Sequence, residues 1–345
     1  MSGPTLTGIR RREAAPDTDL LYYTRCPVPT PSGLAVALGS LGPALGDAHG
    51  VDLRALQDVA DPAIRHHHFD HGIVGLVRDG GNVPAIWARA AGVPTRLLGL
   101  TWLNEAQAIV ATPGAGVDSV ADLVGKRVAI PVAGGSIVDV RGATALRGFE
   151  RALASAGYGV ADVLPVEVAA AELTGPAGDG GGENFDRELD LLEAGLAEAA
   201  FVKGAGGIAA IRERGLRTVL RLDGHPDPLA RVNNGAPRTI TARQELIDER
   251  PELVRGYLEL LGAAQPSLDG DRDELWRVLA RETHQDPAAA AAAYGTVDPD
   301  SLVPRLTRPR LDALQEQADF LFAHGFVPAR VDVDAWALDL GADDE

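Results

Sequence analysis

Apolar and polar residues alternate along the chain with two different periods. Short runs rich in β-branched and aliphatic residues predict strands, and between them apolar residues recur every three or four positions, as on one face of an amphipathic helix. Strands that alternate with helices in this way predict an α/β fold with mostly parallel sheets. The expected strands are 20–24, 51–56, 95–102, 106–111, 127–132, 199–202, 218–222 and 238–241.

Two apolar stripes at helical spacing mark helices in the middle and near the end of the chain. The first consists of Phe185, Leu189, Leu192 and Leu196. The second consists of Leu311, Leu314, Ala318 and Leu321, and Gly325 is expected to end its helix. Stripes of this kind indicate faces packed on a core.

Length and charge narrow the class of protein. A chain of 345 residues with 46% hydrophobic composition is expected to divide into about two domains. The formal net charge of -17 and the absence of any basic run longer than Arg10–Arg12 argue against a nucleic-acid partner. Lysine occurs only at Lys126 and Lys203, so a lysine that faces a pocket is of interest.

The start of the chain and its cysteine content bear on the compartment. The arginines at 10–12 are followed by the acidic segment 13–17, so no apolar signal region follows them, and no window reaches the length of a membrane span. The single cysteine, Cys26, excludes an internal disulfide and a cysteine-cluster metal site. We therefore expect a cytoplasmic monomer with no membrane partner, and a flexible tail over residues 1–16.

Three separated segments resemble one fold group. Residues 111–132, ATPGAGVDSVADLVGKRVAIPV, resemble the segment that opens the second lobe in periplasmic-binding-protein-like folds of the nitrate, sulfonate and thiamin-precursor group. Residues 194–202 resemble the passage from helix to strand at the wall of their interlobe cleft, and residues 250–261 resemble their return helix in lobe one.

This resemblance implies a two-lobed, type II periplasmic-binding-protein-like α/β fold with the ligand cleft between the lobes. Lobe 1 is expected to comprise residues 17–110 and 230–345, and lobe 2 residues 111–229. In such a cleft, helix N-termini and glycine-rich turns direct backbone N–H groups at an anion.

Cys26 lies in the segment LYYTRCPVPTPSG, between a predicted strand and a predicted helix that Pro31 or Ser32 could start. A thiol near a helix N-terminus is in an electropositive setting that favours the thiolate. The prolines on both sides of Val28 make the turn rigid. A lone cysteine is, however, most often a small buried hydrophobic residue, so position alone leaves both interpretations open.

A second cluster lies at residues 64–81, IRHHHFDHGIVGLVRDGG. Adjacent histidines on a strand cannot all face one point, and the sequence offers no clear further ligands, so we predict no metal site. One histidine could instead be a proton-transfer or hydrogen-bonding partner of the thiol, and Arg78 could bind an oxyanion with its guanidinium. The alternative is solvated histidines on a loop and a surface ion pair for Arg78.

Two further features could contribute to a ligand site from lobe 2. Gly134, Gly135 and Ser136 follow a predicted strand and could offer backbone N–H donors, although a plain turn explains them as well. Lys203 follows the predicted strand at 199–202 and could face the cleft; the alternative is a lysine in a surface ion pair.

These pieces occur together in one family, and the chain resembles the aromatic sulfinate desulfinases of the 2'-hydroxybiphenyl-2-sulfinate desulfinase family. The matching motifs are Tyr22-Tyr23 with TRCPVP, His68-Phe69, RDGG at residues 78–81 and RLLGLT at residues 96–101. Further along the chain, residues 143–235 match the family weakly, whereas Arg141-Gly142 and residues 302–337 match it again.

The resemblance implies an enzyme that cleaves the carbon–sulfur bond of a sulfinate with water and releases sulfite, without a metal or organic cofactor. It implies that Cys26 is the catalytic thiol, that His68 is its partner, and that Arg78 and the backbone of Gly81 bind the sulfinate. Thiolate attack at sulfur and proton delivery from the thiol to carbon both remain open.

The chain also departs from the family. Where the cleft wall of the family is rich in aromatic residues, this chain has Phe201-Val202-Lys203-Gly204, which suggests a smaller or more polar substrate with a second anionic or hydroxyl group for Lys203. The alternative function is a non-catalytic solute-binding protein for a sulfonate-like or other small anion. A thiamin-pyrimidine-type synthase is a weaker third possibility, because the surroundings of Cys26 do not resemble that group.

Overall fold

The structure is a computed structural model of the chain. It describes residues 19–26, 28–170, 184–264, 276–278, 280, 287–295 and 299–341. The flexible tail expected at residues 1–16 lies outside the described residues.

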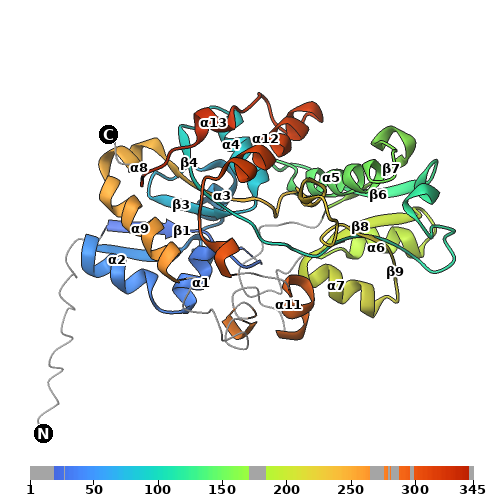
Figure 1. The fold of residues 1–345 in the computed structure, drawn as a ribbon, viewed down its shortest axis with the longest axis horizontal. Helices are drawn as coiled ribbons and strands as arrows, with labels where there is room; N and C mark the ends of the chain where they lie inside the picture. Colours follow the sequence, from blue (N-terminus) through green and yellow to red (C-terminus); the bar gives the residue numbers. More distant parts are fainter. Residues whose placement is uncertain are drawn as a thin grey trace, which may run out of the picture.

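A five-stranded sheet forms the core of the first lobe, in the left half of Figure 1. Its strand order is β2-β1-β3-β10-β4; β1 is parallel to β2 and β3, whereas β10 is antiparallel to both β3 and β4. The strands are β1 (Asp19–Tyr23), β2 (Val51–Ala55), β3 (Leu76–Gly80), β4 (Thr95–Thr101) and β10 (Arg238–Arg243).

A second five-stranded sheet forms the other lobe, in the right half of Figure 1. Its order is β7-β6-β8-β5-β9, with β6 parallel to β7 and β8 and with β5 antiparallel to β8 and β9. The strands are β5 (Gln107–Ala111), β6 (Arg127–Val132), β7 (Leu164–Ala169), β8 (Ala199–Lys203) and β9 (Arg217–Arg221). The chain passes between the lobes after β4 and again before β10.

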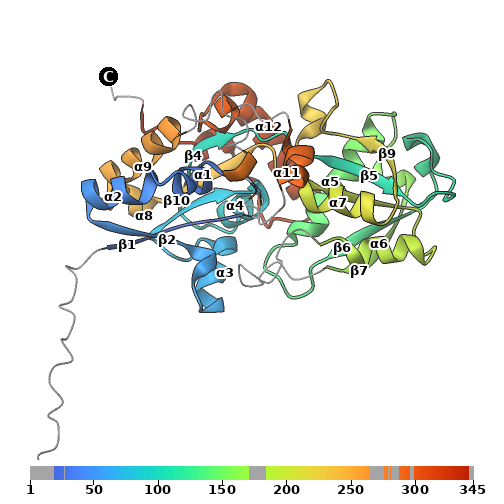
Figure 2. The same cartoon turned by 90° about the horizontal axis from the view of Figure 1, so that it is seen from below.

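Helices cover both sheets, and the second lobe carries α5 (Val140–Ala154), α6 (Asp186–Glu193) and α7 (Gly204–Glu213). In Figures 1 and 2, α11 (Pro287–Tyr294) lies against α7. The first lobe carries α1 (Pro31–Ala37), α2 (Leu41–His49), α3 (Pro62–Asp70), α4 (Asn82–Ala90), α8 (Gln244–Glu249), α9 (Pro251–Ala264), α12 (Arg308–Ala323) and α13 (Val333–Trp336). Short 3-10 turns are η1 (Leu56–Asp58), η2 (Val120–Leu123), η3 (Val160–Asp162), η4 (Pro228–Arg231) and η6 (Pro299–Leu302).

The hydrophobic pattern locates most of these elements. Each of the eight expected strands is present, with ends that differ by two residues or fewer from those expected. The two stripes lie on α6 and α12, except that α6 ends at Glu193, so Leu196 is outside it and exposed. Two strands were not expected: β7, at the edge of the second sheet, and β3, at the centre of the first.

An apolar cluster connects the two lobes. It joins Cys26 and Leu34 of the first lobe to Ala106 before β5, Ala205 of α7 and Ala290 of α11. Cys26 therefore belongs to a cluster to which both lobes contribute side chains. Within the part of the chain that the structure describes, no helix is both long enough and apolar enough to span a bilayer.

Candidate functional site

The first sheet brings three chemically important segments to one edge. Cys26 follows β1, and Arg78 lies near the end of β3, which runs parallel to β1. Because β10 is antiparallel to β3, its first residue, Arg238, lies at the same edge. The carboxyl ends of parallel strands are where α/β folds commonly bind ligands. We therefore take this edge as the candidate site.

Hydrogen bonds fix the thiol against β3. The hydroxyl of Thr24 donates to the Asp79 carbonyl over 2.6 Å and accepts from the Asp79 N–H over 2.8 Å. The Cys26 thiol donates to the same carbonyl, with 3.7 Å between sulfur and oxygen. Gly80 lets the sulfur approach the strand, since a β-carbon there would lie only 2.7 Å from Sγ. The thiol position is thus determined by contacts between residues more than fifty positions apart.

Arg78 is fully buried beside this thiol. Its Nε donates to the carbonyl of His68 over 2.8 Å, whereas Nη1 and Nη2 have no hydrogen-bond partner among the described residues. A β-carbon built on Gly80 would lie 3.8 Å from Nη2 of Arg78 and 2.7 Å from Sγ of Cys26, so the guanidinium and the thiol flank the same glycine. Burial lowers the pKa of Arg78 to about 10, which leaves it charged at neutral pH.

The protonation state of Cys26 differs from the expected thiolate. Burial raises the pKa of the Cys26 thiol, and this effect outweighs the opposing influence of Arg238 and Arg78 and of the Gly81 N–H. The expectation of a thiolate stabilised by a helix N-terminus is therefore wrong for this site. The physical reason is burial, and the first-turn amides of α1 do not offset it, because the Gly33 N–H donates to Thr30 and the Ser32 N–H donates to Asp79.

Asp79 is a buried acid next to the thiol. Its Oδ2 accepts the Ser32 N–H over 2.9 Å, and the Ser32 hydroxyl accepts a 2.8 Å hydrogen bond from the hydroxyl of Tyr257. Burial raises the pKa of Asp79 to about 6, although the Ser32 donors and the charges of Arg238 and Arg78 act in the opposite direction. A carboxyl group with a pKa this close to neutrality can exchange a proton under physiological conditions.

His68 lies in α3, and the structure indicates which ring nitrogen carries its proton. The Arg25 N–H donates to Oε1 of Gln57 over 2.7 Å, so the Gln57 amide nitrogen faces Nδ1 of His68 at 3.3 Å. Nδ1 is then an acceptor, and the proton of the neutral ring is on Nε2. Burial lowers the pKa of His68 well below its ordinary value, and Arg78 and His71 lower it further. His68 is therefore neutral at pH 7.

The other histidines of the cluster point in different directions. His67 pairs with Asp70, with 2.8 Å between Nδ1 and Oδ1. His71 ends α3 with a positive φ of 55° and lies 2.8 Å, through Nε2, from the hydroxyl of Thr241. The segment is a helix rather than the strand or loop that the sequence suggested. In the described residues no group of three histidine, cysteine or acidic side chains could hold a metal ion.

Gly81 lies at the start of α4, and its N–H lowers the pKa of the Cys26 thiol. A β-carbon at Gly81 would collide with the Asn234 side chain, as close as 2.5 Å. The first amides of α4 are occupied, since the Asn82 and Val83 N–H groups both donate to Asn234. Charge at this edge therefore comes from arginine side chains more than from the helix N-terminus.

Gly135 and Ser136 lie in an exposed turn of the second lobe. Gly135 has a φ of 79°, and the Ser136 hydroxyl donates to the carbonyl of Val138 over 3.0 Å. The structure gives neither residue a contact with Cys26 or Arg78 in the described part of the chain, so their role as anion donors stays a prediction.

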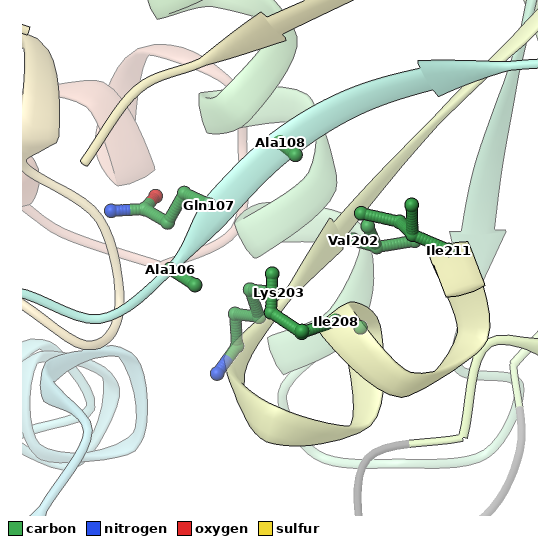
Figure 3. A pocket seen from close by; sticks show the side chains of 8 residues that line it. Ala106, Gln107, Ala108, Val202, Lys203, Ile208 and Ile211 are labelled. Atoms are coloured by element: carbon green, nitrogen blue, oxygen red, sulfur yellow. The ribbon is translucent and has the colours of Figure 1, made fainter. Parts of the chain in front are cut away.

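Lys203 is buried and ion-paired rather than on the surface. Its Nζ lies 3.2 and 3.3 Å from the two carboxylate oxygens of Glu105, and Nη2 of Arg238 lies 3.6 Å from one of them. Figure 3 shows the Lys203 side chain at the end of β8, with its nitrogen directed away from Val202 and Ile211. The alternative of a surface ion pair is thus replaced by a buried pair with Glu105, and the predicted role of Lys203 in substrate binding stays a prediction.

The sequence patterns did not single out four polar residues of this site: Gln57, Asp79, Glu105 and Arg238. Asp79 adjoins Arg78, and Arg238 begins an expected strand, so both were visible as charges inside apolar runs. Their burial could have been inferred from that position. The contacts of Gln57 and Glu105 depend on tertiary structure alone.

Comparisons with known proteins agree with the sequence patterns. No family model matches the chain. The 2'-hydroxybiphenyl-2-sulfinate desulfinase of Rhodococcus erythropolis is 24% identical over 92% of this chain and 91% of its own length. The crystal structure of a cysteine-to-serine mutant of DszB in complex with biphenyl-2-sulfinic acid superposes with a TM-score of 0.72 at 22% identity, covering 93% of this chain and 97% of that one.

A binding protein also shares the fold. The periplasmic aliphatic sulphonate binding protein SsuA from Escherichia coli matches with a TM-score of 0.66 at 17% identity, covering 94% of this chain and 93% of that one. The expected two-lobed, periplasmic-binding-protein-like α/β fold is thereby confirmed. The predicted resemblance is confirmed as well: the chain is a distant homologue of the 2'-hydroxybiphenyl-2-sulfinate desulfinases along 92% of its length.

Proposed function

We propose that this protein is a desulfinase that cleaves the carbon–sulfur bond of a sulfinate with water. In this reaction the sulfinate RSO2⁻ and water give RH and bisulfite, so a C–S bond breaks, a C–H bond forms and no outside oxidant or reductant is needed. The similarity to curated desulfinases along nearly the whole chain supports the reaction class. The binding of biphenyl-2-sulfinic acid by the DszB mutant supports the kind of ligand.

One observation carries the proposal: the described residues give Nη1 and Nη2 of the buried Arg78 guanidinium no hydrogen-bond partner, and this guanidinium lies beside the thiol of Cys26. A buried charge with unused donors is costly unless an anion completes it. A guanidinium presents two parallel N–H groups that match two oxygens of one oxyanion. A sulfinate bound there would place its sulfur and the attached carbon next to Sγ, with the Gly81 N–H as a further donor.

The protonation of the thiol favours one of the two chemical routes. Because the pKa of Cys26 is raised, the resting group is the thiol, which can act as an acid. In the proposed step the thiol proton moves to the substrate carbon while the C–S electron pair forms the new C–H bond, and SO2 leaves. Water adds to SO2 to give bisulfite, and the released proton returns to the Cys26 thiolate. Arg78 and Arg238 stabilise that thiolate while it exists.

In this mechanism His68 is a hydrogen-bond donor rather than a base. Its Nδ1 faces the amide of Gln57, so only Nε2–H is available to a neighbouring anion or water. A neutral ring that donates through Nε2 can hold a sulfinate oxygen or the attacking water without adding another charge to the site.

The decisive experiment incubates the purified protein with a panel of aryl and alkyl sulfinates and measures sulfite. We expect sulfite from at least one sulfinate, a loss of at least about a thousandfold for Cys26→Ser, and a loss of about a hundredfold or more for Arg78→Lys, which keeps the charge but not the two parallel donors. Full activity in Cys26→Ser would refute the assigned thiol.

The second candidate is a binding protein for sulfonate-like anions, favoured by the similarity of the fold to SsuA. It predicts that sulfinates and sulfonates raise the melting temperature of the protein with no sulfite released. Binding without turnover of any sulfinate would therefore favour this function over the desulfinase.

A further inference from the structure

A second buried guanidinium lies at the proposed active site, and the assigned reaction does not require it. Arg238 is only 2% exposed, and its charge, like that of Arg78, lowers the pKa of the Cys26 thiol against the larger effect of burial. Its one ion pair within the described residues is with Glu105, at 3.6 Å, and its Nε has no hydrogen-bond partner there. Arg238 thus stands near the thiol with donors that the described residues leave unused.

Glu105 is an incomplete counter-ion for Arg238. Both of its oxygens lie within hydrogen-bond distance of Nζ of Lys203, at 3.2 and 3.3 Å, whereas the nearest Arg238 nitrogen is beyond that distance. The charge of Arg238 lowers the pKa of Asp79, but the two side chains form no ion pair. Oδ2 of Asp79 accepts a hydrogen bond from the Ser32 N–H. One carboxylate therefore serves two buried cations.

The strand framework holds Arg238 in place independently of these charges. β10 pairs with β3 so that Thr239 lies opposite Gly80, one residue from Arg238. The side-chain amide of Asn82 donates to the carbonyls of Asn233 at 2.8 Å and Pro237 at 2.9 Å, which fixes the chain just before Arg238. The backbone that carries Arg238 is therefore fixed, and a fixed backbone position limits the reorganisation that ligand binding requires.

We propose that the substrate carries a second acidic group, such as a carboxylate a few bonds from the sulfinate, and that Arg238 binds it while Arg78 binds the sulfinate. This inference rests on the proposed desulfinase function. Each guanidinium then has an oxyanion partner, which offsets the cost of burying two arginines at one edge. Because Arg78 and Arg238 lie on the paired strands β3 and β10 at the same edge of the sheet, we expect the two acidic groups to be close together and the substrate to be compact.

The apolar surroundings agree with a compact substrate. The cluster around Cys26 consists largely of small side chains, including Ala106, Ala205 and Ala290. Small apolar side chains of this kind suit a short carbon skeleton between the two acidic groups of the substrate.

The test compares matched sulfinates that differ by one carboxylate: 2-sulfinobenzoate with benzenesulfinate, and 3-sulfinopropanoate with propane-1-sulfinate. We expect kcat/KM for at least one carboxylated member to exceed that of its partner by about tenfold or more. In Arg238→Gln this preference should disappear, through loss of activity on the carboxylated member, and Arg238→Lys should restore part of it. Arg243→Gln, on the same strand and paired with Glu245, is the matched control that should keep the preference.

The outcomes separate the inference from the function. Sulfite release with no carboxylate preference in the wild type, or equal losses on both members in Arg238→Gln, overturns the role of Arg238 and leaves the desulfinase intact. If no sulfinate is turned over, a thermal shift assay with phthalate and benzoate decides. Stabilisation by phthalate above benzoate that is lost in Arg238→Gln supports the two-anion site without the desulfinase, and equal shifts overturn it.

Discussion

Gly80 allows the close contact between strand β3 and the thiol, and we predict that Gly80→Ala displaces the sulfur of Cys26. A β-carbon at this position would lie 2.7 Å from Sγ, whereas non-bonded heavy atoms prefer about 3.5–4.0 Å. The overlap of roughly 1 Å must be relieved by movement of the thiol or of the strand. Gly80 is not among the glycines with positive φ, so the backbone accepts alanine and the contact alone is responsible.

This overlap sets the expected magnitudes. Overpacking of a closely packed interior costs about 1–3 kcal/mol of unfolding free energy. A displacement of about 1 Å at a reacting group can lower the rate about a hundredfold. We therefore expect Gly80→Ala to lower kcat/KM for sulfite release about a hundredfold and to lower the stability measured by urea unfolding by about 1–3 kcal/mol.

Removal of the sulfur isolates the cause. In a Cys26→Ala background the added methyl group at position 80 no longer meets Sγ, so the stability cost of Gly80→Ala should fall to about 0.5 kcal/mol or less. Gly224→Ala is the control substitution, because a β-carbon there meets no atom of the described residues within 4 Å. The same cost of Gly80→Ala in both backgrounds would falsify the clash with the thiol.

Three further predictions concern the groups around the thiol. The pKa of Asp79 is raised to about 6, so its protonated form stabilises the fold most at low pH and this stability is lost as the pH rises from about 4 through about 6. Asp79→Asn should remove up to about 3 kcal/mol of this pH dependence in urea unfolding, and an unchanged profile would contradict the burial effect. Gln57→Leu should lower kcat about tenfold and move the acid limb of the pH–rate profile to higher pH, because His68 is then freer to protonate at Nδ1; an unmoved acid limb would refute the tautomer argument. Iodoacetamide should modify Cys26 more slowly than free cysteine, with activity lost in proportion to the adduct seen by mass spectrometry; activity that survives complete modification would exclude the thiol from the reaction.

The hydrophobic pattern predicted the scaffold better than the site. The strands β1, β6 and β8 are apolar runs whose side chains pack on the core, so periodicity locates them within two residues. Strand β3 was not predicted although it is the central strand of the first sheet and fully buried. Two of its five residues are Arg78 and Asp79, which break the apolar run that identifies a buried strand.

The roles expected from family resemblance depend on spacing and not on burial. Spacing singled out Cys26, His68 and Arg78, and the structure links the last two through a 2.8 Å hydrogen bond from Nε of Arg78 to the His68 carbonyl. The spacing of residues gave no information on the protonation of the Cys26 thiol. The desolvation of this thiol depends on burial in a cluster that includes side chains of the other lobe, such as Ala205. Burial in the folded protein therefore raises the pKa of the Cys26 thiol, which the local sequence was expected to lower.

The buried charges account for both the missed strand and the proposed chemistry. A strand that carries Arg78 and Asp79 into the centre of a sheet is destabilising unless each charge has a partner. The described residues supply that partner for Lys203, through Glu105, but they leave the terminal nitrogens of Arg78 without one and give Arg238 only a long ion pair. The rule that an apolar run identifies a buried strand thus fails at β3, where the described residues leave positive charge uncompensated. An anionic ligand with two acidic groups would compensate that charge, which connects the departure from the strand pattern to the selection of substrate.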